Sequence, residues 1–199
     1  MKTVLQLKSS IFSTDGQSSR LADDLVEALD ADNVVVRDLA KDPVPHLTAE
    51  RFGAFITPAE KRTEDQNATL RYSDLLVSEL KAADTIVLGL PMYNFGVPST
   101  LKAYFDHVAR AGATFRYTEK GPVGLLTGKK AYVVATRGGL YEGSALDTQT
   151  KYVRDFLAFI GITDVEFVYA EGLAISEAGK QASLEKARAA VRQFAPAYA

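Results

Sequence analysis

Short apolar runs alternate with one-sided apolar stripes along most of the chain. The runs that favour β-strands lie at residues 3–7, 34–36, 85–90, 132–136 and 165–170. Several of them are almost continuously apolar, which is typical of parallel strands covered on both faces. This pattern predicts five strands of one parallel sheet.

Between these runs, apolar residues recur at helical spacing. Such stripes lie at residues 21–29, 101–108, 153–160 and 184–194. Each stripe is one-sided, as expected for a helix that packs on a sheet. The alternation of strands and helices predicts an α/β fold with right-handed crossovers. Because no repeat, low-complexity stretch or linker interrupts it, we predict a single domain over residues 1–199.

Two helix starts are marked by local signals. Residues 57–60 (Thr-Pro-Ala-Glu) have the pattern of a capping box with proline at the first helical position. This pattern predicts a helix from there to about Ala82. Pro98 and Ser99 predict the start of the next helix.

Two segments do not fit a minimal five-unit sheet. Residues 41–56 contain two prolines and a glycine, and residues 111–128 contain Phe115, Tyr117 and several glycines. Loops of this length in a compact domain are usually lids or interface elements, although a surface insertion without a role is the alternative. The aromatic side chains of Phe115 and Tyr117 fit a core or a dimer contact equally well.

Composition narrows the class of protein. The chain is 47% hydrophobic and 24% charged, with a net charge of -2, and its basic residues show no cluster that would indicate a nucleic-acid partner. It has no cysteine, which excludes disulfides, thiolate metal sites and a cysteine nucleophile. Gln6 and Lys8 interrupt the short apolar N-terminal run, so we expect neither a signal peptide nor a membrane anchor, and we predict a cytoplasmic protein.

The segment after the first predicted strand, residues 8–20, is rich in hydroxyl side chains and leads through Gly16 into a helix near Gln17. Main-chain N–H groups at a helix start, aided by the helix dipole, can bind a phosphate without a cationic side chain. No lysine stands where a Walker loop would need one. A plain Ser/Thr/Asp helix cap is the alternative interpretation.

The segments after the third and fourth strands have a different chemistry. Met92, Tyr93, Asn94 and Phe95 follow the third strand, and Thr136, Arg137, Gly138 and Gly139 follow the fourth. The first group offers apolar area and an amide for a flat ring, and paired glycines allow main chain to approach a ring closely. Ligands of open parallel sheets bind at this edge. One phosphate loop and two ring loops together predict a site for flavin mononucleotide (FMN).

Longer runs carry a family resemblance. They are Leu-Lys-Ser-Ser at 7–10, Val-Arg-Asp-Leu-Ala at 36–40, Pro-Met-Tyr-Asn-Phe at 91–95, residues 109–112 and 114–119, Thr-Gly-Lys-Lys-Ala at 127–131, Arg-Gly-Gly at 137–139, and residues 159–165. On these runs the sequence resembles the FMN-dependent NADH-azoreductases, a branch of the flavodoxin-like quinone reductases. The resemblance covers nearly the whole chain.

The resemblance implies a flavodoxin-like sheet with strand order 2-1-3-4-5 and helices on both faces. It implies a homodimer with FMN at the interface. The phosphate would be held by Ser10, Gly16, Gln17 and Ser18, the ring would lie on residues 92–95 and 136–139, and Tyr117 and Phe159 would wall the substrate space. One departure is Gly16, where relatives tend to carry serine, so one hydroxyl contact to the phosphate is replaced by a main-chain N–H.

The predicted activity is a ping-pong transfer of electrons from NADH or NADPH, through the flavin, to quinones or to azo compounds, whose azo bond is cleaved reductively. The cofactor carries the chemistry, so no catalytic side chain and no metal is expected. His46 and His107 are interpreted as surface or interface residues, and Arg137 either contacts the flavin edge or forms an outer salt bridge. A flavodoxin-type electron carrier and a non-redox phosphate-binding module are the alternatives.

Overall fold

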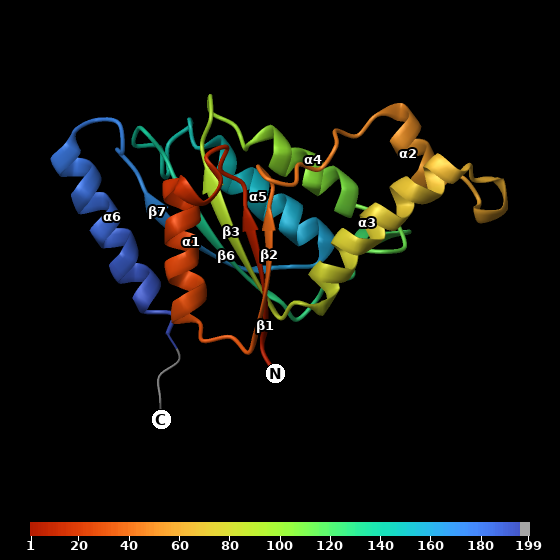
Figure 1. Ribbon diagram of the computed structural model, residues 1–199, viewed down its shortest axis with the longest axis horizontal. Helices are drawn as coiled ribbons and strands as arrows, with labels where there is room; N and C mark the ends of the chain where they lie inside the picture. The colour runs from red at the N-terminus through yellow and green to blue at the C-terminus, as the bar shows by residue number, and fades with distance from the viewer. Residues whose placement is uncertain (196–199) are drawn as a thin grey trace.

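A five-stranded parallel sheet forms the centre of the computed structural model, which describes residues 1–195 (Figure 1). Its strands are β1 (Thr3–Lys8), β2 (Asn33–Asp38), β3 (Thr85–Pro91), β6 (Lys130–Thr136) and β7 (Asp164–Ala170). They lie in the order β2-β1-β3-β6-β7, and every neighbouring pair is parallel. The strand order 2-1-3-4-5 expected for these five strands is therefore confirmed.

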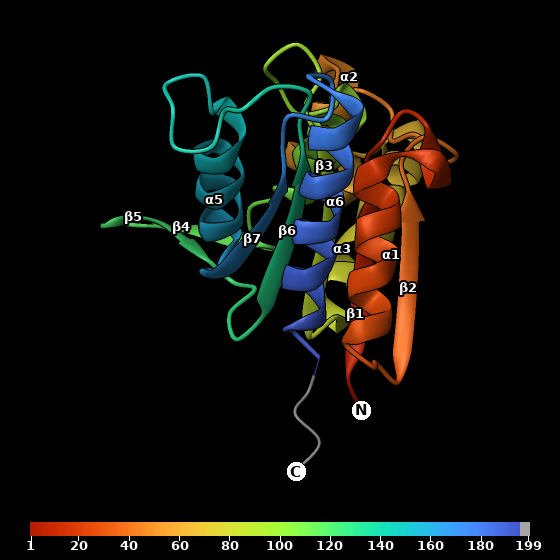
Figure 2. The same ribbon diagram turned by 90° about the vertical axis from the view of Figure 1, so that its left-hand side faces the viewer.

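Helices cover both faces of the sheet. Helices α1 (Gln17–Ala28) and α6 (Glu177–Arg192) pack side by side on one face, and α3 (Glu64–Ala82), α4 (Ser99–Val108) and α5 (Thr148–Ile160) cover the other (Figure 2). Each layer closes its own hydrophobic core against the sheet. The one-sided stripes of the sequence correspond to these buried helix faces.

The strands divide their side chains between the two cores. On β1, Val4 faces the α1/α6 side and Leu5 faces the α3/α4/α5 side, and Val87 and Leu88 divide in the same way on β3. All residues of β3 are buried. This arrangement explains why the central strands are continuous apolar runs, since neither face meets water.

The predicted helix start at residues 57–60 is wrong. Ala59–Lys61 forms only a short 3-10 turn, after which the chain is extended again at Arg62. Helix α3 begins at Glu64, and the capping box is made by Thr63 with Gln66, whose main-chain N–H groups each donate to the other's side-chain oxygen at 3.1–3.2 Å. Thr57 instead ends the preceding helix.

Both long segments contain secondary structure of their own. Residues 41–56 include α2 (Ala49–Ile56), and residues 111–128 include β4 (Phe115–Thr118) and β5 (Gly121–Gly124), which pair as an antiparallel hairpin. The hairpin projects from the side of the domain (Figure 2). Within the described part of the chain, no helix has both the length and the apolarity that a bilayer crossing requires.

Candidate functional site

The loops that follow β1, β3 and β6 meet at the carboxyl edge of the sheet and enclose a cavity of about 180 Å³. Of the residues predicted to bind a cofactor, Ser10, Gly16, Gln17, Ser18, Met92, Tyr93, Thr136, Arg137 and Gly138 line it. Asn94, Phe95 and Gly139 are adjacent in the chain but do not belong to its lining. Phe12, Pro91 and Leu173 complete the wall and were not among the predicted site residues.

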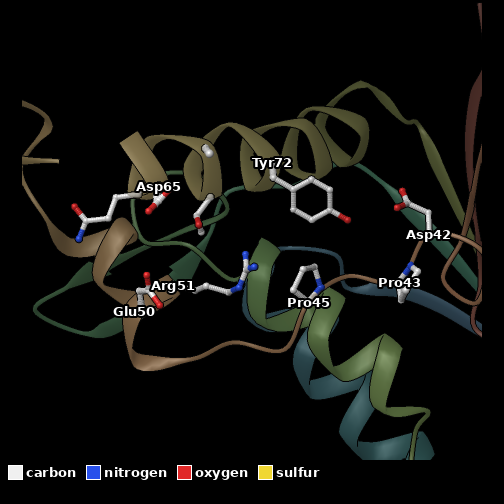
Figure 3. A pocket seen from close by; sticks show the side chains of 10 residues that line it. Asp42, Pro43, Pro45, Glu50, Arg51, Asp65 and Tyr72 are labelled. Atoms are coloured by element: carbon white, nitrogen blue, oxygen red, sulfur yellow. The ribbon is translucent and has the colours of Figure 1, made fainter. Parts of the chain in front are cut away.

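Larger hollows exist, and the one between α2 and α3 differs from this cavity in its chemistry. One of about 480 Å³ lies between α2, α3 and residues 42–45, and Figure 3 shows the side chain of Arg51 pointing into it. Its lining includes Asp42, Glu50 and Asp65. The helix starts at this hollow are already capped by Thr48 and Thr63, and none of the described residues that line it is a glycine, so we assign the site by its chemistry and not by its volume.

The loop after β1 presents an uncapped helix start. Gly16 is the N-cap residue of α1, and no side chain of residues 1–195 caps it. The alternative interpretation of this loop as a Ser/Thr/Asp helix cap is therefore wrong. The hydroxyl of Ser18 is buried and has no hydrogen-bond partner among the described residues. Free N–H groups with a buried, unpaired hydroxyl beside them suit an anion.

Glycine at position 16 is favoured by the limited space and not by the backbone conformation. Its φ of -65° is ordinary, but a Cβ there would lie 2.1 Å from Oγ of Ser10 and 2.5 Å from its Cβ. The Ser10 side chain thus occupies the volume that a side chain at position 16 would need. From there its Oγ accepts from the N–H of Phe12 at 3.2 Å and lies 3.3 Å from the hydroxyl of Tyr93.

The loop after β3 contains a strained turn. Asn94 and Phe95 have φ of 49° and 63°, in the left-handed region that non-glycine residues rarely adopt. Tyr93 and Gly96 close the turn, each donating its N–H to the other's carbonyl at 3.0–3.2 Å. The Phe95 ring meets the ring of Tyr141 edge-on, with 5.6 Å between centroids. Such strain is found at ligand sites when the surroundings hold it in place.

The loop after β6 is held by a buried ion-pair network. The Arg137 guanidinium donates to Asp147 at 2.8 Å, to Thr150 at 3.1 Å and to Glu171 at 3.0 Å, and its side chain is fully buried. Arg137 therefore forms salt bridges inside the protein, and we expect only its main chain to be available to a ligand. Burial alone would raise the pKa of Asp147, but the hydrogen bonds from Arg137 and Thr150 outweigh burial and lower it.

The two aromatic residues expected to wall the substrate space lie away from the cavity within one copy of the chain. Tyr117 is on β4 and 74% exposed, and Phe159 is on α5 and packs against Phe115 at 4.3 Å between ring centroids. Neither is among the described residues that line the cavity. Phe115 itself is buried, so it is a core aromatic. A role for Tyr117 and Phe159 at the site stays a prediction that requires a second copy of the chain.

His107 is not a surface residue. It is fully buried on α4, where the rings of Phe55 and Tyr72 pack edge-on against it. Burial lowers its pKa, so we expect a neutral imidazole near neutral pH. His107 is therefore part of the packing between α2, α3 and α4, and it does not line the cavity at the carboxyl edge.

Sequence reasoning missed the residues that hold the ring loops. Asp147, Thr148, Gln149 and Thr150 at the start of α5 all bond to these loops. One signal was available, because Gln149 continues the apolar stripe of Val153 and Leu157 at a spacing of four. An amide on an apolar helix face indicates a specific buried partner.

The comparison with known proteins agrees with this geometry. Residues 2–195 match the protein family described by its flavodoxin-like fold. The chain belongs to this family. Its sheet order and the position of its cavity at the carboxyl edge are those of a flavodoxin-like protein.

Two curated relatives are similar over most of their length. An FMN-dependent NADH:quinone oxidoreductase of Cellvibrio japonicus is 57% identical over 181 residues, covering 89% of this chain and 91% of that protein. FMN-dependent NADH:quinone oxidoreductase 6 of Burkholderia lata is 53% identical over 195 residues, covering 96% and 98%.

Solved structures extend the similarity to the flavodoxin-like azoreductases. An FMN-dependent NADH-azoreductase of Bacillus anthracis strain Ames Ancestor, crystallised in complex with FMN, superposes with a TM-score of 0.86 at 25% identity. The alignment covers 98% of this chain and all of that one. An azoreductase of Bacillus anthracis strain Sterne superposes with a TM-score of 0.85 at 30% identity, with the same coverage.

Proposed function

We propose that this chain is an FMN-dependent oxidoreductase that passes electrons from NADH to quinones and azo compounds. The observation that carries the proposal is the meeting of an uncapped helix start with two ring loops in one cavity. The names of the curated relatives and of the superposed azoreductases support the same cofactor, donor and acceptor classes. NADH as the donor follows from those names and not from a feature of the cavity.

The residues present fit FMN. The unpaired hydroxyl of Ser18 and the N–H groups at the start of α1 suit the phosphate, with Ser10 and Gln17 beside them. Met92 and Tyr93 on one side, with residues 136–138 on the other, suit the ring system. When bound, FMN supplies hydride and electron transfer between nicotinamide and acceptor.

The chain itself supplies binding and orientation. Tyr93 and Arg137 are the titratable residues among those described as lining the cavity, and the lining contains no carboxylate and no histidine. Arg137 is engaged with Asp147 and Glu171. We therefore propose that protons come from water and that donor and acceptor occupy the same space in turn, a ping-pong mechanism.

We also propose a homodimer. Several large apolar side chains are exposed around the cavity and on the β4–β5 hairpin, namely Ile11, Phe12, Phe95, Leu140 and Tyr117. Contiguous exposed apolar surface indicates a protein contact, and we propose that the side chains beside the cavity form one face of the dimer. A second copy would cover this surface and bring its Tyr117 and Phe159 to the substrate space. A stable monomer by light scattering that still turns over would contradict the dimeric site.

The function is tested by stopped-flow absorbance of the purified protein. We expect bound flavin, bleaching of its visible absorbance by NADH, and its return on addition of a benzoquinone or an azo dye. Initial rates measured at several concentrations of both substrates should give parallel double-reciprocal lines. A flavin that NADH cannot reduce would favour the electron-carrier alternative, and a protein that binds no flavin would favour the non-redox alternative. We place the activity in the cytoplasm, where NADH is available.

A further inference from the structure

The first turn of α5 contacts both ring loops of the site. Asp147 caps the helix by accepting the N–H of Thr150 at 3.0 Å, and the four side chains from Asp147 to Thr150 all reach toward the loops after β3 and β6. We propose that these four residues, here called the α5 clamp, fix the shape of the ring slot, with Gln149 as the principal positioning residue. The proposal rests on the proposed FMN site.

Gln149 ties together the two ends of the loop after β3. Its side chain is fully buried, and its Nε2 donates to the carbonyl of Pro91 at 2.9 Å and to the carbonyl of Gly96 at 3.0 Å. Pro91 ends the strand and Gly96 ends the strained turn. Because both partners are acceptors, the NH₂ group must face them, and both of its hydrogens are used. One side chain thus closes the loop that carries Met92 and Tyr93.

Thr148 holds the tip of the same loop. Its hydroxyl donates to the carbonyl of Phe95, the second of the two residues with left-handed φ. Left-handed backbone at non-glycine residues persists only where neighbouring groups hold it. Thr148 and Gln149 together supply three hydrogen bonds to main-chain carbonyls between residues 91 and 96. The unfavourable turn conformation is therefore stabilised from α5.

The same turn of helix holds the loop after β6. Asp147 and Thr150 both accept from Arg137, and Arg137 also donates to Glu171. Glu171 in turn accepts the N–H of Tyr141 at 3.0 Å, which continues the network along that loop. A main-chain bond from Met92 to Thr136 at 3.0 Å joins the two loops directly. The α5 clamp therefore sets the position of each ring loop relative to the other.

Helix packing alone does not explain a buried amide side chain on α5. Gln149 lies on the apolar face of α5 with Val153 and Leu157, and its Oε1 has no hydrogen-bond partner among residues 1–195. A leucine at this position would bury no such oxygen, and burial of an unpaired polar atom is unfavourable. Gln149 does not line the cavity, so its contribution is to hold the loop that does.

The test compares Gln149→Leu with the matched control Gln181→Leu, which changes an exposed glutamine on α6. We expect the FMN dissociation constant of Gln149→Leu, measured by flavin fluorescence quenching on the FMN-free protein, to rise roughly 10- to 30-fold, the change expected when two neutral hydrogen bonds to a binding loop are lost. The midpoint potential of the bound flavin should shift, and amide exchange at residues 93–96 should quicken. The control should match the unsubstituted protein.

Two results overturn the proposal. One is a Gln149→Leu protein that melts at a lower temperature while its FMN dissociation constant and flavin potential are unchanged, because Gln149 is then only a packing residue. The other is unchanged amide exchange at residues 93–96. Should Gln149→Leu fail to fold, Thr148→Val, which removes one exposed hydroxyl, replaces it with the same expected directions. If the unsubstituted protein binds no FMN, the proposed function fails, while the exchange measurement on the FMN-free proteins still judges the clamp.

Discussion

The phosphate loop and the ring loops of this site differ in how far they depend on distant side chains. In the phosphate loop, part of the bonding is local, since Ser13 donates its N–H to the carbonyl of Ser10 and Phe12 donates its N–H to the Ser10 hydroxyl. Distant residues add to it, because the Ser13 hydroxyl donates to Asp38 and the Tyr93 hydroxyl accepts the N–H of Ile11 at 3.3 Å. In the ring loops, the holding residues are distant. Gln149 lies 58 positions from Pro91, and Arg137 lies 34 positions from Glu171.

This difference shows that the loops on the two sides of one cavity can depend on different parts of the fold for their conformation. A loop with main-chain bonds of its own, such as the turn at residues 10–16, keeps part of its shape without distant partners. A loop held by distant side chains depends on the packing of α5 and on the end of β7. We expect substitutions in the phosphate loop to change ligand affinity alone, and substitutions behind the ring loops to change both affinity and stability.

The largest expected effect comes from the ion-pair network behind the ring loops. Arg137→Met keeps the volume and apolar stem of the side chain but leaves Asp147 and Glu171, with side chains 8% and 11% exposed, without their cation. Removal of one partner of a buried ion pair lowers the free energy of unfolding by about 3–5 kcal/mol. Urea unfolding of the FMN-free protein measures this change. A loss no larger than that of an exposed pair such as Lys151→Met would show that the network is not needed for folding.

The same network predicts acid sensitivity. The folded-state pKa of Asp147 is lowered, so the carboxylate stabilises the fold above the pKa it has in the unfolded chain. That contribution is lost as the pH falls through the lower, folded-state pKa. In Asp147→Asn this part of the acid-induced loss should be absent, which unfolding curves recorded between neutral and acidic pH can measure. An unchanged pH dependence in Asp147→Asn would contradict the assignment.

The next largest effect is expected in the phosphate loop. The double substitution Ser10→Ala and Ser18→Ala removes two hydroxyls from the lining of the cavity. Loss of two hydrogen bonds to a charged phosphate should raise the FMN dissociation constant about 100-fold. The contact of Ser10 with Tyr93 is lost, but Thr148 and Gln149 still hold the turn, so amide exchange at residues 93–96 should not change. The control is Ser78→Ala, which removes an exposed hydroxyl on α3. If the FMN dissociation constant of the double variant rises less than threefold, the phosphate is not bound by these two hydroxyls.

Much of the fold followed from periodicity alone. The central strands were found because β3 and β6 are almost wholly buried, so their sequences are nearly continuous apolar runs, whereas buried Gln6 and Lys8 interrupt the run of β1. The start of α3 was misplaced, because residues 57–60 and residues 63–66 both have the form of a capping box and only the tertiary position of Thr57 at the end of α2 separates them. Helix α2 and the β4–β5 hairpin were missed because both are short and contain glycine or proline.

The site was predictable to the extent that it is local. The phosphate loop could be read from hydroxyls and a glycine before a helix, and the cavity includes all four residues predicted there. The role of Arg137 could not be read, because Asp147 and Glu171 approach it only after the chain has folded. The same holds for Gln149, whose partners are main-chain carbonyls that any residue type could present.

The smallest expected effect is at Gly16. In Gly16→Ser the new Cβ would lie 2.1 Å from the Ser10 hydroxyl, so the Ser10 side chain and its stretch of loop must shift. The shift breaks the contact of Ser10 with Tyr93 but adds a hydroxyl at the N-cap of α1. Since glycine and serine differ by only a few tenths of a kcal/mol as N-caps, we expect the FMN dissociation constant to change by less than about threefold.

The informative measurement on Gly16→Ser is amide exchange, which shows how far along the chain the structural change extends. Tyr93 is the one residue that joins the two halves among the contacts described, accepting from Ile11 at 3.3 Å and lying 3.3 Å from the Ser10 hydroxyl. If the halves are independent, faster amide exchange should be confined to residues 9–16, with residues 93–96 unchanged because the α5 clamp still holds them. Exchange that quickens in both segments would show that Tyr93 transmits the shift, and the ring slot would then depend on the phosphate loop as well as on α5.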